Sequence, residues 1–409
     1  MKDGYKDTLF GKLPDTWNIS KIKDITVEHK QGYFTKEPYV NDGIYLARVT
    51  DLKNPLIDFS DMPKLNISNK DYEDFKICKD DFLFARSGAI GRYGIFENDT
   101  KPAIFGSYII RFRFDLEFVV NRYIGYFYES SICRQQLKSI SQGNANVNIN
   151  AENIKSLNLP IPPLTEQQKI ADILTTVDEK LENIESQIAE YTNLKTGLMQ
   201  QLLTKGIGHT NFVDSELGMI PEGWRVVKLK EIVKFNNGKA HEGCVDESGN
   251  YIIVNSKFIS TEGKTRKYTN ENLCPLRKGD IALVMSDIPN GKAIAKCFIV
   301  KEDNIYTLNQ RICSISPING ISEYLFYILN RNKYYLQFDN GVSQTNLRKD
   351  EVLECPILFP PIAEQMKIAD ILSTVDIKLE SIQQKKEEFT NMKKGLMEQL
   401  LTGRIRVKV

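Results

Sequence analysis

The residues whose types could make specific polar contacts gather first in a glycine-rich stretch, RSGAIGRYG at 86–94. The candidates in it are Arg86, Ser87, Gly88, Arg92 and Tyr93. Arginine donors recognise guanine edges and backbone phosphates in nucleic acids. The stretch lacks the Gly-Lys-Ser/Thr ending of a phosphate-cradling loop, so it does not predict nucleotide binding. Two interpretations stay open: a loop that contacts nucleic acid, or a hairpin with ordinary solvated arginines.

Amide side chains form a second candidate group, because Asn and Gln pair with adenine edges and also bind phosphates. In the first half of the chain the candidates are Gln142, Asn144 and Asn146. In the second half the candidates include hydroxyl and basic side chains as well as amides: Ser286, Asn290, Lys292, Asn309, Gln310, Arg311, Gln344 and Arg348. Repeated Asn can instead close turns through bonds from side chain to backbone. We favour that structural interpretation for Gly143, Asn148, Gly341 and Asn346, which recur at the same place in both halves.

Residues for catalysis or metal binding are sparse. The seven cysteines are widely spread and the chain has three histidines, so we predict reduced thiols and no metal site. A DNA methyltransferase would need a Gly-rich cofactor loop and an Asn/Asp-Pro-Pro-aromatic motif, whereas the two Pro-Pro pairs precede Leu164 and Ile362. A metal-dependent nuclease would need carboxylates and a lysine that converge on one sheet. The sequence contains no compact set of these residues. The sequence therefore predicts a chain that is not an enzyme and binds no cofactor itself.

Composition and charge are those of a folded protein near neutrality. Hydrophobic residues make up 41% of the 409 residues, charged residues 26%, and the net charge is +1. No apolar run approaches the roughly 20 residues of a membrane span, and the charged N-terminus lacks a signal sequence, so we expect a cytoplasmic protein. Proteins that bind DNA alone usually carry a basic excess. Neutrality therefore argues weakly against a free-standing DNA binder, while a basic face stays possible.

The clearest feature of the sequence is an internal repeat. Residues 163–207 and 361–405 align at an offset of 198, with identity at 28 of 45 positions. Each half also opens on a similar segment, GKLPDTW ending at Trp17 and GMIPEGW ending at Trp224, and we expect both tryptophans to be buried. The predicted order is a variable domain (1–163), a helix (164–205), a second variable domain (206–360) and a second helix with a C-terminal tail (361–409).

Both repeated segments are predicted to be long helices. Neither has an internal proline, and apolar residues recur with the three-four spacing of a coiled coil over about five heptads. Two near-identical stripes in one chain suggest that the helices pair with each other. If the halves share one fold, a pseudo-two-fold axis would make this pairing antiparallel. The variable domains would then sit at opposite ends of a rigid spacer.

The variable domains contain short β-branched and aromatic runs between Gly, Asn and Asp turns, which indicates strands. Residues 123–128 and 324–329 are expected to form short helices. The predicted fold class is α+β. It comprises two pseudo-symmetric α+β domains with curved, mostly antiparallel sheets, separated by two long antiparallel coiled-coil helices.

This ordered set of features resembles the specificity subunit of type I restriction-modification systems. The resemblance rests on the PPLTEQQKI helix start, the Gly-x-x-Pro-x-x-Trp openings and the duplicated plan, and it spans essentially the whole chain. It implies two target-recognition domains that each read one half of a split DNA site, in a subunit without chemistry of its own. The stretch at 86–94 is similar to the recognition loop of the family. Two different domains on a symmetric spacer predict a bipartite, asymmetric target with an unread gap.

The resemblance also implies partners besides double-stranded DNA. Two methyltransferase subunits would dock on the helices, and motor-nuclease restriction subunits would join the complex. The complex would use S-adenosylmethionine, and ATP with Mg²⁺ where nuclease subunits are present. Polar residues that are identical in both helices are the candidate partner contacts: Gln167, Lys169, Asp172, Gln365, Lys367 and Asp370. Solvated helix surface is the alternative for these six. The rival function, favoured by the neutral charge, is a coiled-coil scaffold that binds no DNA.

Overall fold

Two long helices are the largest elements of the chain. The computed structural model describes residues 4–86, 91–97, 101–141, 149–288, 292–339, 341 and 344–408. Helix α5 spans Leu164–Lys205 and helix α11 spans Ile362–Leu400. Each begins directly after a Pro-Pro pair, because proline has no N–H to lose and its fixed φ suits a helix start. At 1.5 Å per residue, each helix is about 60 Å long.

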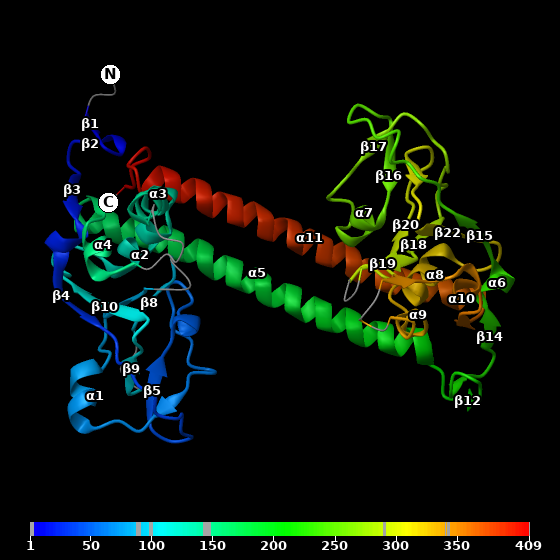
Figure 1. Ribbon diagram of the computed structural model, residues 1–409, viewed down its shortest axis with the longest axis horizontal. Helices are drawn as coiled ribbons and strands as arrows, with labels where there is room; N and C mark the ends of the chain where they lie inside the picture. Colours follow the sequence, from blue (N-terminus) through cyan, green and yellow to red (C-terminus); the bar gives the residue numbers. More distant parts are fainter. Residues whose placement is uncertain are drawn as a thin grey trace. The chain divides into compact units, whose positions relative to one another are not determined.

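The chain divides into two compact units that each contain half of both long helices. The first unit comprises Met1–Glu185 with Gln384–Val409, and the second comprises Ser186–Gln383. Leu174 of α5 shares the core of the first unit with Leu400 of α11, and Leu202 of α5 shares the core of the second with Leu372 of α11. The start of each helix therefore lies beside the end of the other (Figure 1). This confirms the predicted antiparallel pairing.

Each unit contains a four-stranded sheet whose strands pair antiparallel, as predicted. The strand order, which the sequence did not indicate, is the same in both units. In the first unit the order is β4-β10-β7-β8, with β4 at Thr26–Gln31, β7 at Phe82–Ala85, β8 at Tyr93–Ile95 and β10 at Ile109–Phe114. In the second unit the order is β15-β22-β18-β20, with β15 at Val233–Asn237, β18 at Ile281–Val284, β20 at Cys297–Ile299 and β22 at Ile312–Pro317. The inner strands β7 and β18 are buried at every position, which explains their continuous apolar sequences.

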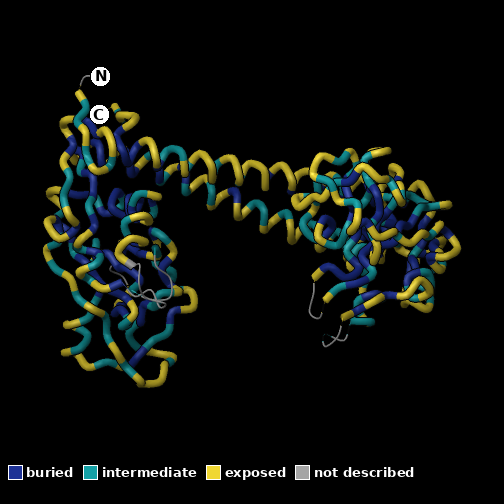
Figure 2. Tube along the Cα trace, turned by 45° about the horizontal axis from the view of Figure 1, so that its top comes forward, coloured by how far each residue is buried: buried dark blue, intermediate teal, exposed yellow. Residues whose placement is uncertain are grey.

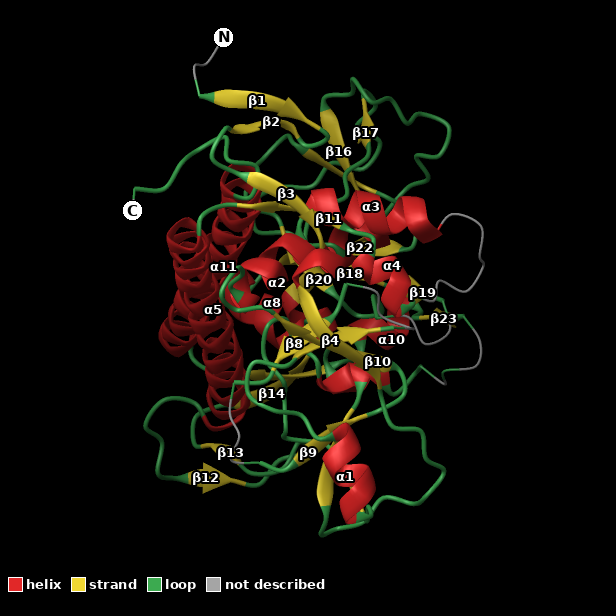
Figure 3. Cartoon of the chain, turned by 90° about the vertical axis from the view of Figure 1, so that its left-hand side faces the viewer, coloured by secondary structure: helices red, strands yellow, loops and turns green. Residues whose placement is uncertain are grey.

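A smaller three-stranded sheet packs against the first sheet and contains one parallel pairing in each unit. Its order in the first unit is β6-β5-β9, with β5 at Ile44–Ala47, β6 at Lys64–Leu65 and β9 at Ala103–Phe105. In the second unit the order is β17-β16-β21, with β16 at Tyr251–Val254, β17 at Tyr268–Thr269 and β21 at Tyr306–Leu308. Figure 3 shows β9 beside helix α1 (Asn69–Phe75), and the ring of Phe75 lies 6.3 Å from that of Phe105 in β9, measured between centroids.

Large aromatic side chains fill the core of each unit, where Figure 2 shows the buried segments of the chain. Trp17 is 0% exposed and Trp224 is 5% exposed, so both are core residues, as predicted. The seven cysteines are free thiols, and the buried ones are Cys133, Cys297, Cys313 and Cys355. Burial raises the pKa of the Cys355 thiol to about 12, so this group is protonated and inert at neutral pH.

A tyrosine from a short helix ties each sheet to a long helix. Helix α2 spans Asn121–Glu129 and helix α8 spans Ser322–Leu329, which confirms the two predicted short helices. The Tyr126 hydroxyl donates to Asp178 of α5 at 2.9 Å, and the Tyr327 hydroxyl donates to Asp376 of α11 at 2.8 Å. The two units therefore attach their long helices in the same way.

A glutamate in the first turn of each long helix binds the segment that follows the other helix. Glu166 of α5 accepts from the Arg406 Nε at 2.9 Å. Glu364 of α11 accepts from the backbone N–H of Ile207 at 3.0 Å and lies 2.8 Å from His209 Nε2. Burial acts to raise the pKa of Glu364, but the hydrogen bonds that it accepts lower this pKa below the ordinary value.

The remaining elements are short. In the first unit they are β1 (Tyr5–Thr8), β2 (Gly11–Pro14), β3 (Asn18–Lys21), η1 (Ile22–Ile25), η2 (Val49–Asp51), α3 (Ser131–Ser141), α4 (Ala151–Lys155) and β11 (Asn158–Ile161). In the second unit they are β12 (Phe212–Val213), β13 (Ile220–Pro221), β14 (Arg225–Lys228), α6 (Leu229–Ile232), α7 (Ser256–Ser260), β19 (Ser286–Asp287), α9 (Lys333–Leu336), β23 (Thr345–Asn346), α10 (Lys349–Leu353) and β24 (Pro356–Phe359). Within the described part of the chain, no helix is both long and apolar enough to cross a membrane.

Candidate nucleic-acid interface

In each unit, two segments of backbone pass so close to each other that only glycine fits at the point of contact, which we call the glycine crossing. A Cβ atom added at Gly32 would lie 2.1 Å from the carbonyl oxygen of Gly106, and one added at Gly238 would lie 1.9 Å from that of Asn309. Such distances are far inside van der Waals contact, so each crossing requires a residue without a side chain. The crossing places the segment after the glycine against the turn that leads into the central strand β10 or β22.

Backbone hydrogen bonds make the two crossings equivalent residue by residue. Arg86 N donates to Tyr108 O at 2.8 Å, and Met285 N donates to Arg311 O at 3.0 Å. The segments after the glycines likewise bond to Phe105 O in the first unit and to Leu308 O in the second. The equivalent pairs are Tyr33 and Lys239, Gly106 and Asn309, Ser107 and Gln310, Tyr108 and Arg311, and Arg86 and Met285.

In the first unit this crossing forms one wall of an open cleft of about 830 Å³. Its aromatic and cationic lining comprises Tyr33, Phe34, Lys36, Tyr39, Arg48, Arg92 and Tyr108. Phe34 is 70% and Tyr108 66% exposed, which is unusual for large apolar side chains. The Arg48 guanidinium is fixed by the nearly buried Asp51 at 2.8 Å, and this hydrogen bond raises the pKa of Arg48. Exposed rings beside fixed cations can stack on bases and neutralise phosphates.

The equivalent place in the second unit is a smaller hollow of about 120 Å³ with a polar lining. His241 is 1% exposed, and its Nε2 lies 3.0 Å from the Thr307 hydroxyl. Its backbone N–H donates to the side-chain oxygen of Asn309 at 3.2 Å, and Gln310 Nε2 donates to Glu242 Oε1 at 2.6 Å. The same backbone framework therefore presents aromatic and cationic groups in one unit and mainly polar groups in the other.

The sequence-predicted contacts fall partly on this framework. Arg92 lines the cleft of the first unit, and the backbone N–H of Arg86 bonds to Tyr108, which also lines it. Asn309, Gln310 and Arg311 form the equivalent turn of the second unit. Lys292, Gln344 and Arg348 are exposed elsewhere in the second unit. The predicted residues outside the described part of the chain are Ser87, Gly88, Gln142, Asn144, Asn146 and Asn290.

Two predicted contact residues are buried, and the expectation that they touch DNA is corrected. Tyr93 is 0% exposed, stacks on Phe82 with 5.0 Å between ring centroids, and donates to Glu129 Oε1 at 2.9 Å. Burial and the Glu129 charge raise the pKa of Tyr93 well above its ordinary value. Ser286 is 7% exposed, and its hydroxyl accepts from Gln344 Nε2 at 2.8 Å. Both side chains hold the fold together behind the surface.

The two repeated glutamines of the long helices also turn out to be internal. Gln167 is 0% exposed, accepts from Val120 N at 2.9 Å and donates to Phe118 O at 2.9 Å. Gln365 is 0% exposed and accepts from Ile321 N at 3.0 Å. Their identity reflects a shared attachment of each helix to its own unit, which corrects their assignment to a partner-facing surface. The four repeated charges do lie on the surface: Lys169, Asp172, Lys367 and Asp370.

Several lining residues of the first cleft were missed by sequence reasoning: Tyr33, Phe34, Lys36, Tyr39, Arg48 and Tyr108. A signal was present in the aromatic and basic residues that follow Gly32, because interleaved rings and cations are typical of nucleic-acid surfaces. Their approach to Tyr108 depends on the bridge between Tyr33 and Gly106, and the approach of Arg48 depends on the parallel pairing of β5 and β9. The sequence indicates neither.

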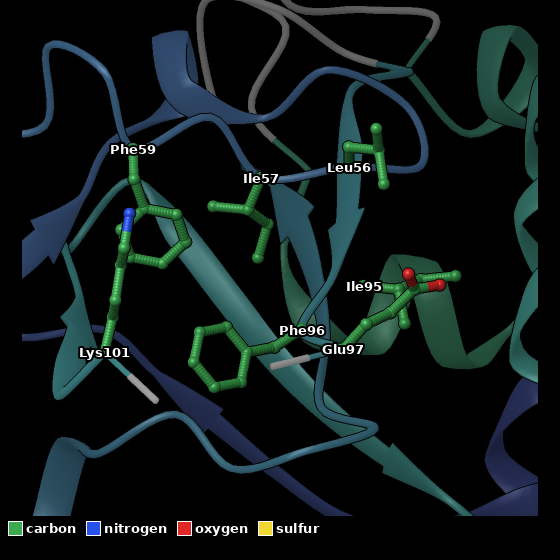
Figure 4. A pocket seen from close by; sticks show the side chains of 7 residues that line it. All are labelled: Leu56, Ile57, Phe59, Ile95, Phe96, Glu97 and Lys101. Carbon is green, nitrogen blue, oxygen red and sulfur yellow. The ribbon is translucent and has the colours of Figure 1, made fainter. Parts of the chain in front are cut away.

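A separate hollow of about 230 Å³ in the first unit has no features of a cofactor site. Figure 4 shows its lining side chains, which are mostly aliphatic and aromatic. The Lys101 Nζ lies 4.9 Å from the ring centroid of Phe59, and Glu97 is paired with Arg122 at 2.7 Å. Across the described ranges, no group of three or more His, Cys, Asp or Glu side chains is placed to hold a metal ion.

Comparisons with known proteins agree on one family. The model of the type I restriction modification DNA specificity domain matches residues 14–191 and again residues 221–391. The type I restriction enzyme MjaVIII specificity subunit of Methanocaldococcus jannaschii is 29% identical, covering 100% of this chain and 97% of that protein. The StySPI specificity subunit of Salmonella potsdam is 25% identical, covering 88% of this chain and 81% of that protein.

Solved structures agree on the fold. The crystal structure of the type I restriction-modification system S subunit from M. genitalium superposes with a TM-score of 0.61 at 17% identity, covering 94% of this chain and 96% of that one. The two family matches fall on the two repeated halves, so each half is one specificity domain. The chain belongs to the family of type I restriction-modification DNA specificity subunits.

Proposed function

We propose that this chain recognises the DNA target of a type I restriction-modification complex, with each unit reading one half of a bipartite, asymmetric sequence. The observation that carries the proposal is the glycine-dependent crossing that recurs in both units. It supplies one framework for two readers, while the side chains on it differ in chemistry. Two different readers on equivalent frameworks call for two different half-sites.

The chain itself is proposed to be non-catalytic and cytoplasmic, and to bind two methyltransferase subunits. The exposed charges Lys169 and Asp172 on α5 recur as Lys367 and Asp370 on α11, so the same partner surface is available twice. The partners would supply the S-adenosylmethionine chemistry, and restriction subunits, where present, would supply ATP- and Mg²⁺-dependent cleavage. This chain would contribute target recognition and assembly.

The test is to express the chain with its cognate methyltransferase subunit in a host that lacks both, and to map methylated bases across the genome. We expect a motif of two specific blocks separated by an unspecified gap. Exchanging residues 4–161 for the equivalent part of a relative with a different target should change one block and leave the other intact. A continuous motif, or methylation unchanged by the exchange, would overturn the proposal.

A further inference from the structure

The positions of Tyr108 and Arg311 are equivalent in the two units. Each residue directly precedes the central strand of its four-stranded sheet, β10 or β22. Each has its carbonyl oxygen fixed by a backbone N–H, from Arg86 in the first unit and from Met285 in the second. Each side chain is exposed. The fold thus places two chemically different side chains at equivalent backbone positions of the two units.

The neighbours of Arg311 are engaged within the protein, whereas its own guanidinium is available. The Asn309 side-chain oxygen accepts from His241 N, and the Gln310 amide donates to Glu242. The Arg311 guanidinium makes no hydrogen bond or ion pair with another residue in the described part of the chain. Its backbone lies in the left-handed region, with φ of 68°. An exposed arginine with free donors, whose carbonyl oxygen is held by Met285 N, is suited to contact a ligand.

We propose that this position determines base specificity, and that Arg311 recognises a guanine in the half-site of the second unit. The inference rests on the proposed function. A guanidinium can donate two parallel bonds to O6 and N7 of guanine, and the other bases do not offer this pair of acceptors in the major groove. Tyr108, at the equivalent position, lacks two parallel N–H donors, so the first unit makes no guanine contact from this position.

The experiment uses the full methyltransferase complex and three substitutions, Arg311→Ala, Arg311→Lys and Tyr108→Arg. In the wild-type motif, the block assigned to the second unit should contain guanine. Arg311→Ala should relax that one position, with the preference for guanine falling by about 5- to 150-fold. Arg311→Lys should relax it too, because lysine keeps the charge but lacks the planar fork. Tyr108→Arg should create a new guanine preference in the other block.

Arg277→Ala is the matched control. Arg277 is exposed and precedes strand β18, whereas Met285, the backbone partner of Arg311, follows the same strand. This control should leave both blocks of the motif unchanged. Thermal unfolding of each complex checks that the variants are folded, and Arg311→Lys provides the result if the alanine variant fails to assemble.

A phosphate contact predicts a different pattern. If Arg311 only neutralises a phosphate, Arg311→Ala weakens binding to every DNA sequence. It also reduces the slope of log binding constant against log salt concentration by about one. Arg311→Lys then restores both the binding and the slope. That pattern with an unchanged motif, or a second block without guanine, overturns the inference while the bipartite motif itself still stands. Absence of any bipartite motif in the wild type would instead overturn the proposed function.

Discussion

The indole Nε1 of Trp224 donates a hydrogen bond to Oε2 of Glu364 across 2.9 Å. The same contact occurs in the first unit, where the Trp17 indole donates to Glu166 Oε2 at 3.2 Å. Each tryptophan precedes the four-stranded sheet of its unit in the sequence. Each glutamate lies in the first turn of the long helix that follows that sheet. One carboxylate therefore fixes where each long helix joins its unit.

Replacing Glu364 by alanine should lower the free energy of unfolding of the second unit by about 2–3 kcal/mol. The reason is that the N–H groups of Trp224 and Ile207 lose a charged acceptor. Glu364→Gln should cost less, since an amide oxygen still accepts. Urea denaturation, monitored by hydrogen exchange in the second unit, measures the loss of stability caused by each of the two substitutions. Glu380→Ala, at an exposed position of α11, should change stability by less than about 0.5 kcal/mol. Equal losses for the three variants would contradict this role.

The stability of the second unit should fall as acid protonates Glu364. Burial acts to raise its pKa, but the bonds from Ile207, Trp224 and His209 lower it below the ordinary 4.5. A group with a lowered folded pKa stabilises the fold above its unfolded pKa, and this contribution is lost as pH falls through the folded value. Unfolding midpoints of wild type and Glu364→Gln should therefore converge from about pH 6 to about pH 3. If the difference between the two unfolding midpoints stayed constant across this pH range, the charge of the Glu364 carboxylate would not be what stabilises the second unit.

Adding a methyl group at either glycine crossing should disrupt one unit only. Gly32→Ala places Cβ 2.1 Å from a backbone oxygen, and Gly238→Ala places it 1.9 Å from one. Each should destabilise its own unit by several kcal/mol, on the order of the larger effects of single substitutions. Hydrogen exchange resolved by segment would locate the loss. Gly197→Ala, with nothing within 4 Å in helix α5, should instead stabilise the protein by about 1 kcal/mol.

Reversing one repeated charge should remove one bound partner. Lys169→Glu affects the α5 copy of the surface and Lys367→Glu the α11 copy, and both lysines are exposed. If each surface holds one methyltransferase subunit, each single variant should carry about one subunit and the double variant none, because like charges at an interface repel. Native mass spectrometry counts the subunits. Gln167→Ala should lower stability instead, because it removes an internal attachment. Two subunits on the double variant would refute this docking site.

The repeat made the helices and their antiparallel pairing predictable. Apolar residues at coiled-coil spacing and the offset of 198 between the copies indicate both length and partner, because a repeated stripe of this size is most simply buried against its own copy. The burial of Trp17 and Trp224 followed from the same repetition. Local patterns of this kind depend on residues close in sequence or present twice.

The cleft and the internal glutamines were not predictable in this way. The cleft depends on parallel pairing between β5 and β9, which are separated by strands, loops and a helix, and no local pattern encodes that partner. Gln167 and Gln365 look like surface residues because amides are mostly exposed, and only the carbonyl and N–H groups of the neighbouring turn reveal their internal role. Tyr93 was misplaced because the glycines around it suggest a loop, whereas it lies in strand β8.

The first unit is assembled from the two ends of the chain, and this sets an order for folding during synthesis. The second unit is one continuous segment, so it can close before residues 384–409 of the first unit are synthesised. The first unit needs Leu400 for its core and Arg406 for its bond to Glu166, and both residues follow the whole second unit in the sequence. At about 5–20 residues per second, its N-terminal part waits about 10–45 s after emerging from the ribosome. Its partly covered core is then the surface that a chaperone would have to protect.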